Sequence, residues 1–142
     1  MLNEEEQGRL TGFLAEALEA GTVSITAIKR FHGGASRETY GLDVLVDGTP
    51  RGLIVRRDPA DSLIDTERAV EFAAYQSCEG SDVPAPRAIA LVEDGVILGA
   101  PFFVMERIDG GEAGSPFDPA TYGDHRASLG RALVTTLGRI HA

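Results

Sequence analysis

Two adjacent arginines stand where an apolar run ends, in the stretch GLIVRRD at residues 52–58 of this 142-residue chain. Guanidinium groups are forked cations that pair with anions such as carboxylates and phosphates. Side chains alternate across a strand, so Arg56 shares a face with Ile54, and Arg57 shares the other face with Val55. Only one arginine can therefore face a given site. The alternative is that both arginines reach from the strand end into water.

A Gly-Gly turn in the stretch FHGGASRETY, residues 31–40, is a second feature suited to anions. Glycine lets the backbone approach a ligand closely and leaves its N–H groups free to point at phosphate oxygens. The pattern G-x-G-x-x-G of dinucleotide-binding loops is not satisfied. A plain hairpin turn is therefore the alternative interpretation.

Two further features complete the set. Glu67 and Glu71 lie four residues apart on one helical face. If either is buried among its small apolar neighbours it needs a cationic partner; the alternative, a solvated helix face, is favoured for Glu67 and left open for Glu71. The apolar run FFVMERIDGG, residues 102–111, ends abruptly in a loop. Unpaired backbone groups at such a strand end suit a flat heterocycle, unless this is only a core strand leaving the sheet.

Composition narrows the classes of function. The chain has 13 basic and 22 acidic residues, a formal charge of −9, which works against binding a nucleic-acid backbone. No apolar stretch approaches the roughly 18 residues of a membrane span, and the acidic start MLNEEEQGRL differs from a signal peptide. With 43% hydrophobic residues and the single cysteine Cys78, we expect a cytoplasmic globular protein with neither nucleic acid nor membrane as partner.

The first half of the chain must position the glycine turn and the arginines. Asn3 and Glu6 form a capping-box pattern that starts a helix, and Gly21 offers its stop. A texture typical of strands follows, with a hairpin signal at Asp47-Gly48. The predicted strands are residues 22–31, 37–46 and 51–57.

The second half of the chain supplies the helix with the glutamates and the second strand end. A helix capped by Ser62 and ended by Gly80 is followed by two strands, one starting near Arg87 and one within residues 100–108. The order of elements predicts an α+β fold: a five-stranded antiparallel sheet, a helix inserted between strands three and four, and a helix at each end of the chain. The last helix, from about Tyr122, carries an apolar stripe of Leu129, Leu133, Leu137 and Ile140.

Taken in order, these features resemble the N-terminal lobe of the aminoglycoside phosphotransferase family, which has the protein-kinase-like fold. More narrowly, they resemble the branch associated with acyl-CoA dehydrogenases. The resemblance covers roughly residues 23–142 and depends on the series rather than on any single motif. The matching stretches are GGASRETY as glycine loop, LIVRRDP as third strand, EFAAYQSCEGSDVPAPRAIAL as helix and proline turn, GAPFFVMERIDG as hinge, and LGRIHA near the end.

The resemblance implies an ATP site. Arginine stands where the wider family carries lysine, which keeps the charge and offers a fork for two phosphate oxygens. For the phosphates, the resemblance implies that the backbone of Gly33, Gly34, Ala35 and Ser36 covers them, and that Arg56 binds one of them and is held by Glu71. For the adenine, it implies that Ile54 and Met105 line the ring and that the backbone of Glu106 and Ile108 bonds its edge.

The resemblance also implies what this chain lacks. The family's catalytic aspartate and magnesium ligands belong to a second lobe, in a His-Gly-Asp loop and the residues after it, whereas this sequence stops at LGRIHA. Asp109, Asp118 and Asp124 lie in the wrong context to replace them. We therefore expect residues 1–108 to be a nucleotide-binding lobe with a leading helix, and residues 109–142 to be a hinge and the first helix of a second lobe. Neither a catalytic residue nor a metal ligand is predicted here.

The expected function is the ATP-binding lobe of a phosphotransferase that moves the γ-phosphoryl group of ATP to a hydroxyl of a small acceptor. ATP and Mg²⁺ are the expected cofactors, and the chain alone is expected to be inactive. The alternative is a non-catalytic nucleotide-binding or protein-interaction module, which associates through the apolar stripe of the last helix.

Overall fold

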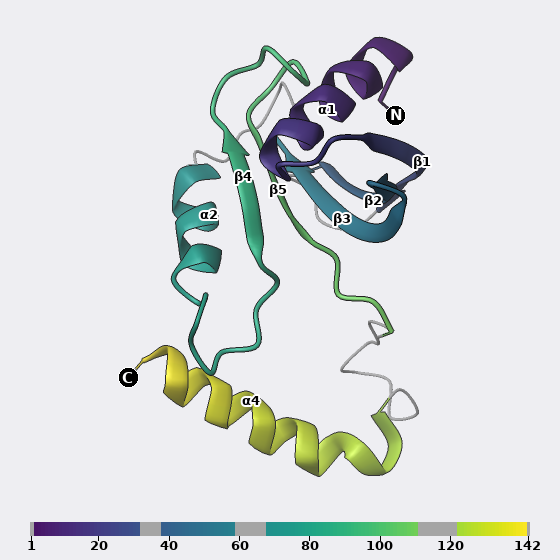
Figure 1. Cartoon of the computed structure of the whole chain (residues 1–142). Helices are drawn as coiled ribbons and strands as arrows, with labels where there is room; N and C mark the ends of the chain where they lie inside the picture. Colours follow the sequence, from purple (N-terminus) through teal and green to yellow (C-terminus); the bar gives the residue numbers. More distant parts are fainter. Residues whose placement is uncertain (1, 32–37, 59–67, 111–121, 142) are drawn as a thin grey trace.

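Five antiparallel strands form one sheet in the order β1-β2-β3-β5-β4 (Figure 1). The computed structural model describes residues 2–31, 38–58, 68–110 and 122–141. The predicted α+β fold is confirmed, including the helix between β3 and β4. The elements are α1 (Glu4–Ala17), β1 (Val23–Phe31), β2 (Glu38–Val46), β3 (Thr49–Arg57), α2 (Arg68–Gln76), β4 (Ala88–Val92), β5 (Phe102–Glu106), the 3₁₀ turn η1 (Gly123–His125) and α4 (Arg126–Ile140).

The leading helix α1 starts as predicted and ends earlier. Asn3 Oδ1 accepts a hydrogen bond from the Glu6 amide at 2.9 Å, and the Glu6 carboxylate accepts one from the Asn3 amide at 2.8 Å, which completes the capping box. The predicted stop at Gly21 is wrong. The helix ends at Ala17 because Glu19, with φ of 51°, already takes the left-handed conformation that turns the chain away.

A two-residue turn joins β2 to β3, as the Asp47-Gly48 pair predicted. Both residues have positive φ, 47° and 80°, which matches the twist of the flanking strands. The Asp47 carboxylate also accepts a hydrogen bond from the Thr22 amide at 2.7 Å, so it ties the turn to the start of β1. The strand β3 begins at Thr49, two residues earlier than predicted, because so short a turn lets pairing start at once.

Replacing Asp47 by alanine is expected to lower the free energy of unfolding by about 1–2 kcal/mol, because it removes the bond to the Thr22 amide and puts an ordinary residue at positive φ. Urea denaturation measures the change. Asp47→Asn is the matched control, since asparagine tolerates this conformation and keeps an acceptor oxygen; it should lose less than half as much. Equal stability of the alanine variant and the wild type would contradict the role of this turn.

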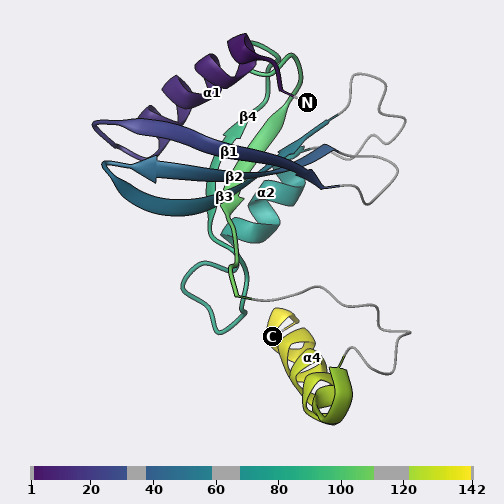
Figure 2. The same ribbon diagram turned by 90° about the vertical axis from the view of Figure 1, so that its right-hand side faces the viewer.

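Helices cover opposite faces of the sheet (Figures 1 and 2). On one face, Leu10 and Leu14 of α1 pack into the main apolar core. On the other face, Phe72 of α2 packs against Phe103 of β5, with ring centroids 6.0 Å apart. The main core contains Leu2, Leu10, Leu14, Tyr40, Leu42, Val44, Leu53, Val55, Leu98, Phe102 and Val104. Alternation along β3 therefore puts Val55 in this core and Ile54 on the face that carries α2.

The later helices differ in detail from expectation. The helix α2 ends at Gln76 rather than at Gly80, which takes the left-handed conformation, φ 74°, in the turn that follows. The predicted cap Ser62 and Glu67 lie outside the described residues.

The last helix, α4, lies below the sheet in Figure 2, and Arg139 Nη1 donates to the Asp82 carbonyl at 2.8 Å. No helix in the described ranges combines the length and the apolar character needed to cross a membrane.

Candidate functional site

An open pocket of about 400 Å³ lies where β5 leaves the sheet. It brings together four residues that the sequence singled out, Ile54, Met105, Glu106 and Ile108. Ile54 of β3 and Met105 of β5 are direct partners across the two strands. The full lining is Phe31, Ile54, Pro86, Met105, Glu106, Arg107, Ile108, Asp109 and Gly110. Apolar side chains beside backbone at a strand end are suited to a flat, edge-polar ligand.

Phe31 forms one wall of this pocket and its ring lies against Gly41; the sequence analysis missed both residues. A Cβ atom on Gly41 would lie 2.8 Å from Phe31 Cε2 and 3.9 Å from Ile54 Cδ1. The Phe31 ring therefore lies against the bare backbone of β2, next to Ile54, and a side chain at Gly41 would displace it. The ring is 40% exposed, so the wall is open to a ligand.

The Arg56 guanidinium bonds the Glu71 carboxylate on the same face of the sheet. Their side chains are only 23% and 15% exposed. The pair that the resemblance implied is thus in contact. The Phe103 ring also supports the guanidinium, with 5.9 Å between Arg56 Cζ and the ring centroid. The position of a cation beside the pocket is consequently held by a carboxylate and a buried ring.

Arg68 is a buried cation that the sequence analysis did not single out. Its side chain is 3% exposed and lies 2.7 Å from Asp58 Oδ1 and 2.9 Å from Glu71 Oε2. Glu71 therefore bridges two arginines, one oxygen to Arg56 and one to Arg68. The spacing of three residues between Arg68 and Glu71 on one helix was the available signal, because it places both on the same helical face.

The alternative interpretation, in which the arginines reach from the strand end into water, is wrong for Arg57. Its side chain is 20% exposed and lies on the face that α1 covers. Arg57 Nη1 donates to Glu6 Oε1 and to the Leu98 carbonyl, both at 3.0 Å, and Nε lies 3.0 Å from Glu38 Oε2. The predicted alternation holds, since the two arginines serve opposite faces. The sequence did not indicate that Arg57 forms ion pairs with Glu6 and Glu38 on the face that α1 covers.

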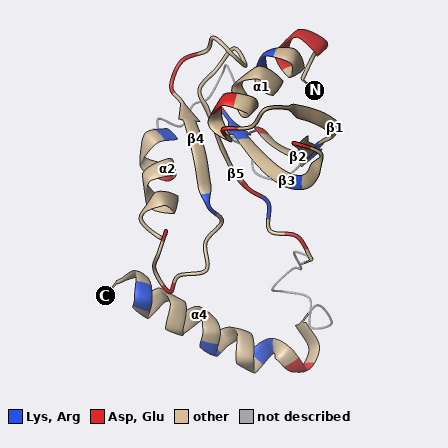
Figure 3. Ribbon diagram, in the orientation of Figure 1, with Lys and Arg blue, Asp and Glu red and all other residues tan. Residues whose placement is uncertain are grey.

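The segment that leaves β5 is tied back to the sheet. The Glu106 amide donates to the Arg87 carbonyl at 2.9 Å, and the Arg107 amide donates to the Gly52 carbonyl at 3.0 Å. Figure 3 shows acidic and basic residues close together where the chain leaves β5. The hydrogen bond to Asp109, and after it the one to Asp43, raises the pKa of the Arg107 guanidinium. The backbone next to the pocket is therefore held in place.

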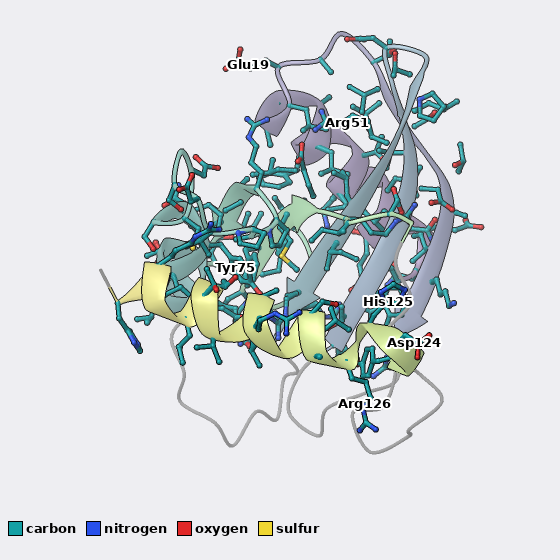
Figure 4. The ribbon with its side chains drawn as sticks, turned by 90° about the horizontal axis from the view of Figure 1, so that it is seen from below. Glu19, Arg51, Tyr75, Asp124, His125 and Arg126 are labelled. Atoms are coloured by element: carbon teal, nitrogen blue, oxygen red, sulfur yellow. The ribbon has the colours of Figure 1, made fainter. Side chains whose placement is uncertain are left out.

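Of the remaining predicted residues that the structure describes, Asp109 lines the pocket and Asp124 does not. Gly33, Gly34, Ala35 and Ser36 lie outside the described residues, as does Asp118. Asp109 pairs with Arg107, and Asp124 lies with His125 and Arg126 at the start of α4 (Figure 4). Within the described ranges, no three His, Cys, Asp or Glu side chains form a group that could hold a metal ion.

Comparisons with known proteins give a family match, curated relatives and a structural neighbour. The sequence profile "APH: Phosphotransferase enzyme family" matches residues 27–142. "Acyl-CoA dehydrogenase family member 10" of Mus musculus is 28% identical over 138 residues, and the match spans 96% of this chain and 12% of that protein. "Probable acyl-CoA dehydrogenase IBR3" of Arabidopsis thaliana is 25% identical over 81% of this chain and 14% of that protein. The solved structure of a "putative aminoglycoside phosphotransferase" from Ralstonia eutropha superposes with a TM-score of 0.65 and 22% identity, over 94% of this chain and 37% of that one.

Proposed function

Because the chain belongs to the phosphotransferase enzyme family, we propose that it is the ATP-binding lobe of a small-molecule phosphotransferase. The parent protein transfers the γ-phosphoryl group of ATP to a hydroxyl of a small acceptor. The observation that carries the proposal is the pocket of about 400 Å³ beside the pair of Arg56 and Glu71 on one face of the sheet. The apolar pocket suits a base, and the Arg56 guanidinium suits phosphate oxygens.

Adenine is the proposed occupant of the pocket. Its flat ring contacts the apolar side chains of Ile54 and Met105, while its polar edge meets the backbone next to β5. The Glu106 amide already donates to the Arg87 carbonyl, so the base would use the Glu106 carbonyl and the Ile108 amide. This supports binding of a heterocycle with both a donor and an acceptor on one edge.

The triphosphate is proposed to run along β3 toward Arg56. Residues two apart on a strand are separated by roughly 7 Å, which is about the span from a base to the first phosphates of an extended nucleotide. Glu71 keeps the Arg56 guanidinium in place, and its planar fork suits two phosphate oxygens. The role of the backbone of Gly33, Gly34, Ala35 and Ser36 over the phosphates stays a prediction.

The groups that complete the chemistry are proposed to lie elsewhere in the parent protein. The chain spans 12% and 14% of the curated relatives and 37% of the structural neighbour. Mg²⁺ would supply charge neutralisation between the phosphates, and its ligands, the catalytic aspartate and the acceptor site are assigned to the second lobe. This chain alone is accordingly proposed to bind ATP without transferring its phosphoryl group, in the cytoplasm and without nucleic acid or membrane as partner.

ATP binding to the chain is tested by titration into ¹⁵N-labelled protein, with adenosine and tripolyphosphate as separate probes. ATP and adenosine are expected to shift the amide signals of Met105 and Ile108, and tripolyphosphate those near Arg56. The amides of Leu10 and Leu14, buried on the opposite face, serve as the internal control. Absence of any shift at millimolar ATP, or shifts confined to the α1 face, would overturn the proposal.

The apolar stripe of α4 favours a second candidate, a non-catalytic nucleotide-binding or protein-interaction module. Its four residues Leu129, Leu133, Leu137 and Ile140 are 47%, 72%, 51% and 56% exposed. An exposed apolar helix face favours association with another surface. Phosphoryl transfer to a hydroxyl acceptor by the full-length parent would decide for the enzyme, whereas ATP binding with no transfer to a panel of acceptors would decide for the module.

A further inference from the structure

The Arg107 side chain lies directly over Gly52 in the middle of β3. A Cβ atom on Gly52 would lie 2.6 Å from Arg107 Nε and 2.7 Å from its Cζ and Nη2 atoms, so only glycine leaves room for the guanidinium. From this position Arg107 Nη1 reaches Asp43 Oδ1 of β2 at 2.7 Å, and Nε reaches Asp109 Oδ1 at 2.6 Å. One side chain thus connects two strands to the segment that follows β5.

We propose that Arg107 is a positioning residue, a latch that orients residues 106–110 so that their backbone forms the base-binding edge of the pocket. This inference rests on the proposed ATP site. The backbone bond from the Arg107 amide to the Gly52 carbonyl, at 3.0 Å, fixes where the strand ends. The side chain then fixes the two residues beyond it, since Asp109 is bonded to the same guanidinium that bonds Asp43.

The geometry separates this role from the binding of phosphate. Arg107 approaches β2 and β3 where the chain leaves β5, whereas Arg56 lies two residues further along the strand from Ile54 and bonds Glu71. Ile108 and Gly110, which line the pocket, flank the latched Asp109 in sequence. Loss of the latch should therefore reduce recognition of the base and leave recognition of the phosphates unchanged. If the Arg107 side chain only stabilised the fold, its loss would weaken base binding and phosphate binding equally.

Two variants break the latch in different ways. Arg107→Ala removes the guanidinium, and Gly52→Ala keeps it but displaces it, at little cost to the fold because the clashing atoms are the far end of a flexible side chain. Arg107→Lys keeps the charge but lacks the fork that reaches both carboxylates. Arg9→Ala is the matched control, because it removes an arginine whose ion pair with Glu5, at 2.6 Å, lies within α1 and involves no residue of the pocket.

Dissociation constants are measured for ATP, adenosine and tripolyphosphate, with thermal unfolding as a check on folding. We expect Arg107→Ala and Gly52→Ala to bind ATP and adenosine about fivefold to tenfold more weakly. Arg107→Lys should lie between them and the wild type, and Arg9→Ala should be unchanged. Tripolyphosphate binding should stay within about twofold for all four variants.

Each other outcome overturns the inference. Adenosine binding by Gly52→Ala equal to that of the wild type would show that the position of the guanidinium does not matter. Parallel losses for adenosine and tripolyphosphate would show general damage rather than positioning. A wild-type chain that binds none of the three probes would refute the proposed ATP site itself, and this result is distinguishable because it appears before any variant is made.

Discussion

Replacing Arg56 by alanine is expected to weaken binding of ATP by about tenfold to a hundredfold, the largest effect on binding for any single side chain of this lobe. A charge-assisted hydrogen bond contributes about 1.5–3 kcal/mol, and each 1.4 kcal/mol is a factor of ten in the dissociation constant. Glu71 keeps its second cationic partner, Arg68, at 2.9 Å, so the fold should tolerate the change. Calorimetric titration with ATP measures the loss.

Arg57→Ala is the matched control, because it removes the same group one position along the same strand. Its guanidinium binds Glu6 and Glu38 on the α1 face, so ATP affinity should stay within about twofold of the wild type. The free energy of unfolding should instead fall by about 2 kcal/mol, since two partly buried carboxylates lose a cation. The reverse pattern, with Arg57→Ala losing ATP and Arg56→Ala losing stability, would show that the site lies on the other face of the sheet.

Arg68→Ala is expected to have the largest effect on stability, a loss of about 3 kcal/mol in the free energy of unfolding. Removing one partner of a buried ion pair leaves a charge without compensation, and such changes cost about 3–5 kcal/mol. We expect the low end of this energy range, because Asp58 is 22% exposed and Glu71 keeps Arg56 as a partner. The lost contact with the Phe103 ring, 6.0 Å from the guanidinium, adds to the effect. Denaturation in urea measures the change.

Two further variants separate the effect of losing the Arg68 charge from the effect of losing its volume, and from the effect of removing an arginine elsewhere. Arg68→Met keeps most of the apolar stem, so any loss it shares with the alanine variant comes from the ion pairs. Arg9→Ala removes an arginine whose ion pair with Glu5 is solvent-exposed, at 39% and 81% for the two side chains, and should cost at most about 1 kcal/mol. A change at Arg68 no larger than that at Arg9 would contradict a structural role for the buried network.

Features that depend on near neighbours in the chain were predictable. The capping box at Asn3 and the turn at Asp47-Gly48 are made by residues within three positions of each other, so their chemistry can be read locally. Alternation along β3 likewise assigned Arg56 and Arg57 to opposite faces. The helix ends at Gly21 and Gly80 were not predicted correctly, because other residues took the turn conformations or ended the helical bonding first.

The candidate site divides in the same way. The series of motifs pointed to Ile54, Met105 and the pairing of Arg56 with Glu71, which the structure places around one pocket and in one ion pair. The packing of Phe31 against Gly41 could not be predicted, because it depends on which residues of β1 and β2 lie beside each other. Register across strands is set by packing of the whole sheet rather than by any short stretch.

By itself, the sequence determined the α+β order of elements and the opposite faces of Arg56 and Arg57, because these follow from periodicity and local turn chemistry. The series of motifs added the resemblance to the family. Only the tertiary structure decided that Arg57 meets Glu6, that Arg68 is buried against Glu71, and that Arg107 lies over Gly52. Each of these contacts joins different elements or requires a cation to be enclosed. Their existence depends on how helices and strands pack in three dimensions, which residue types along the chain do not specify.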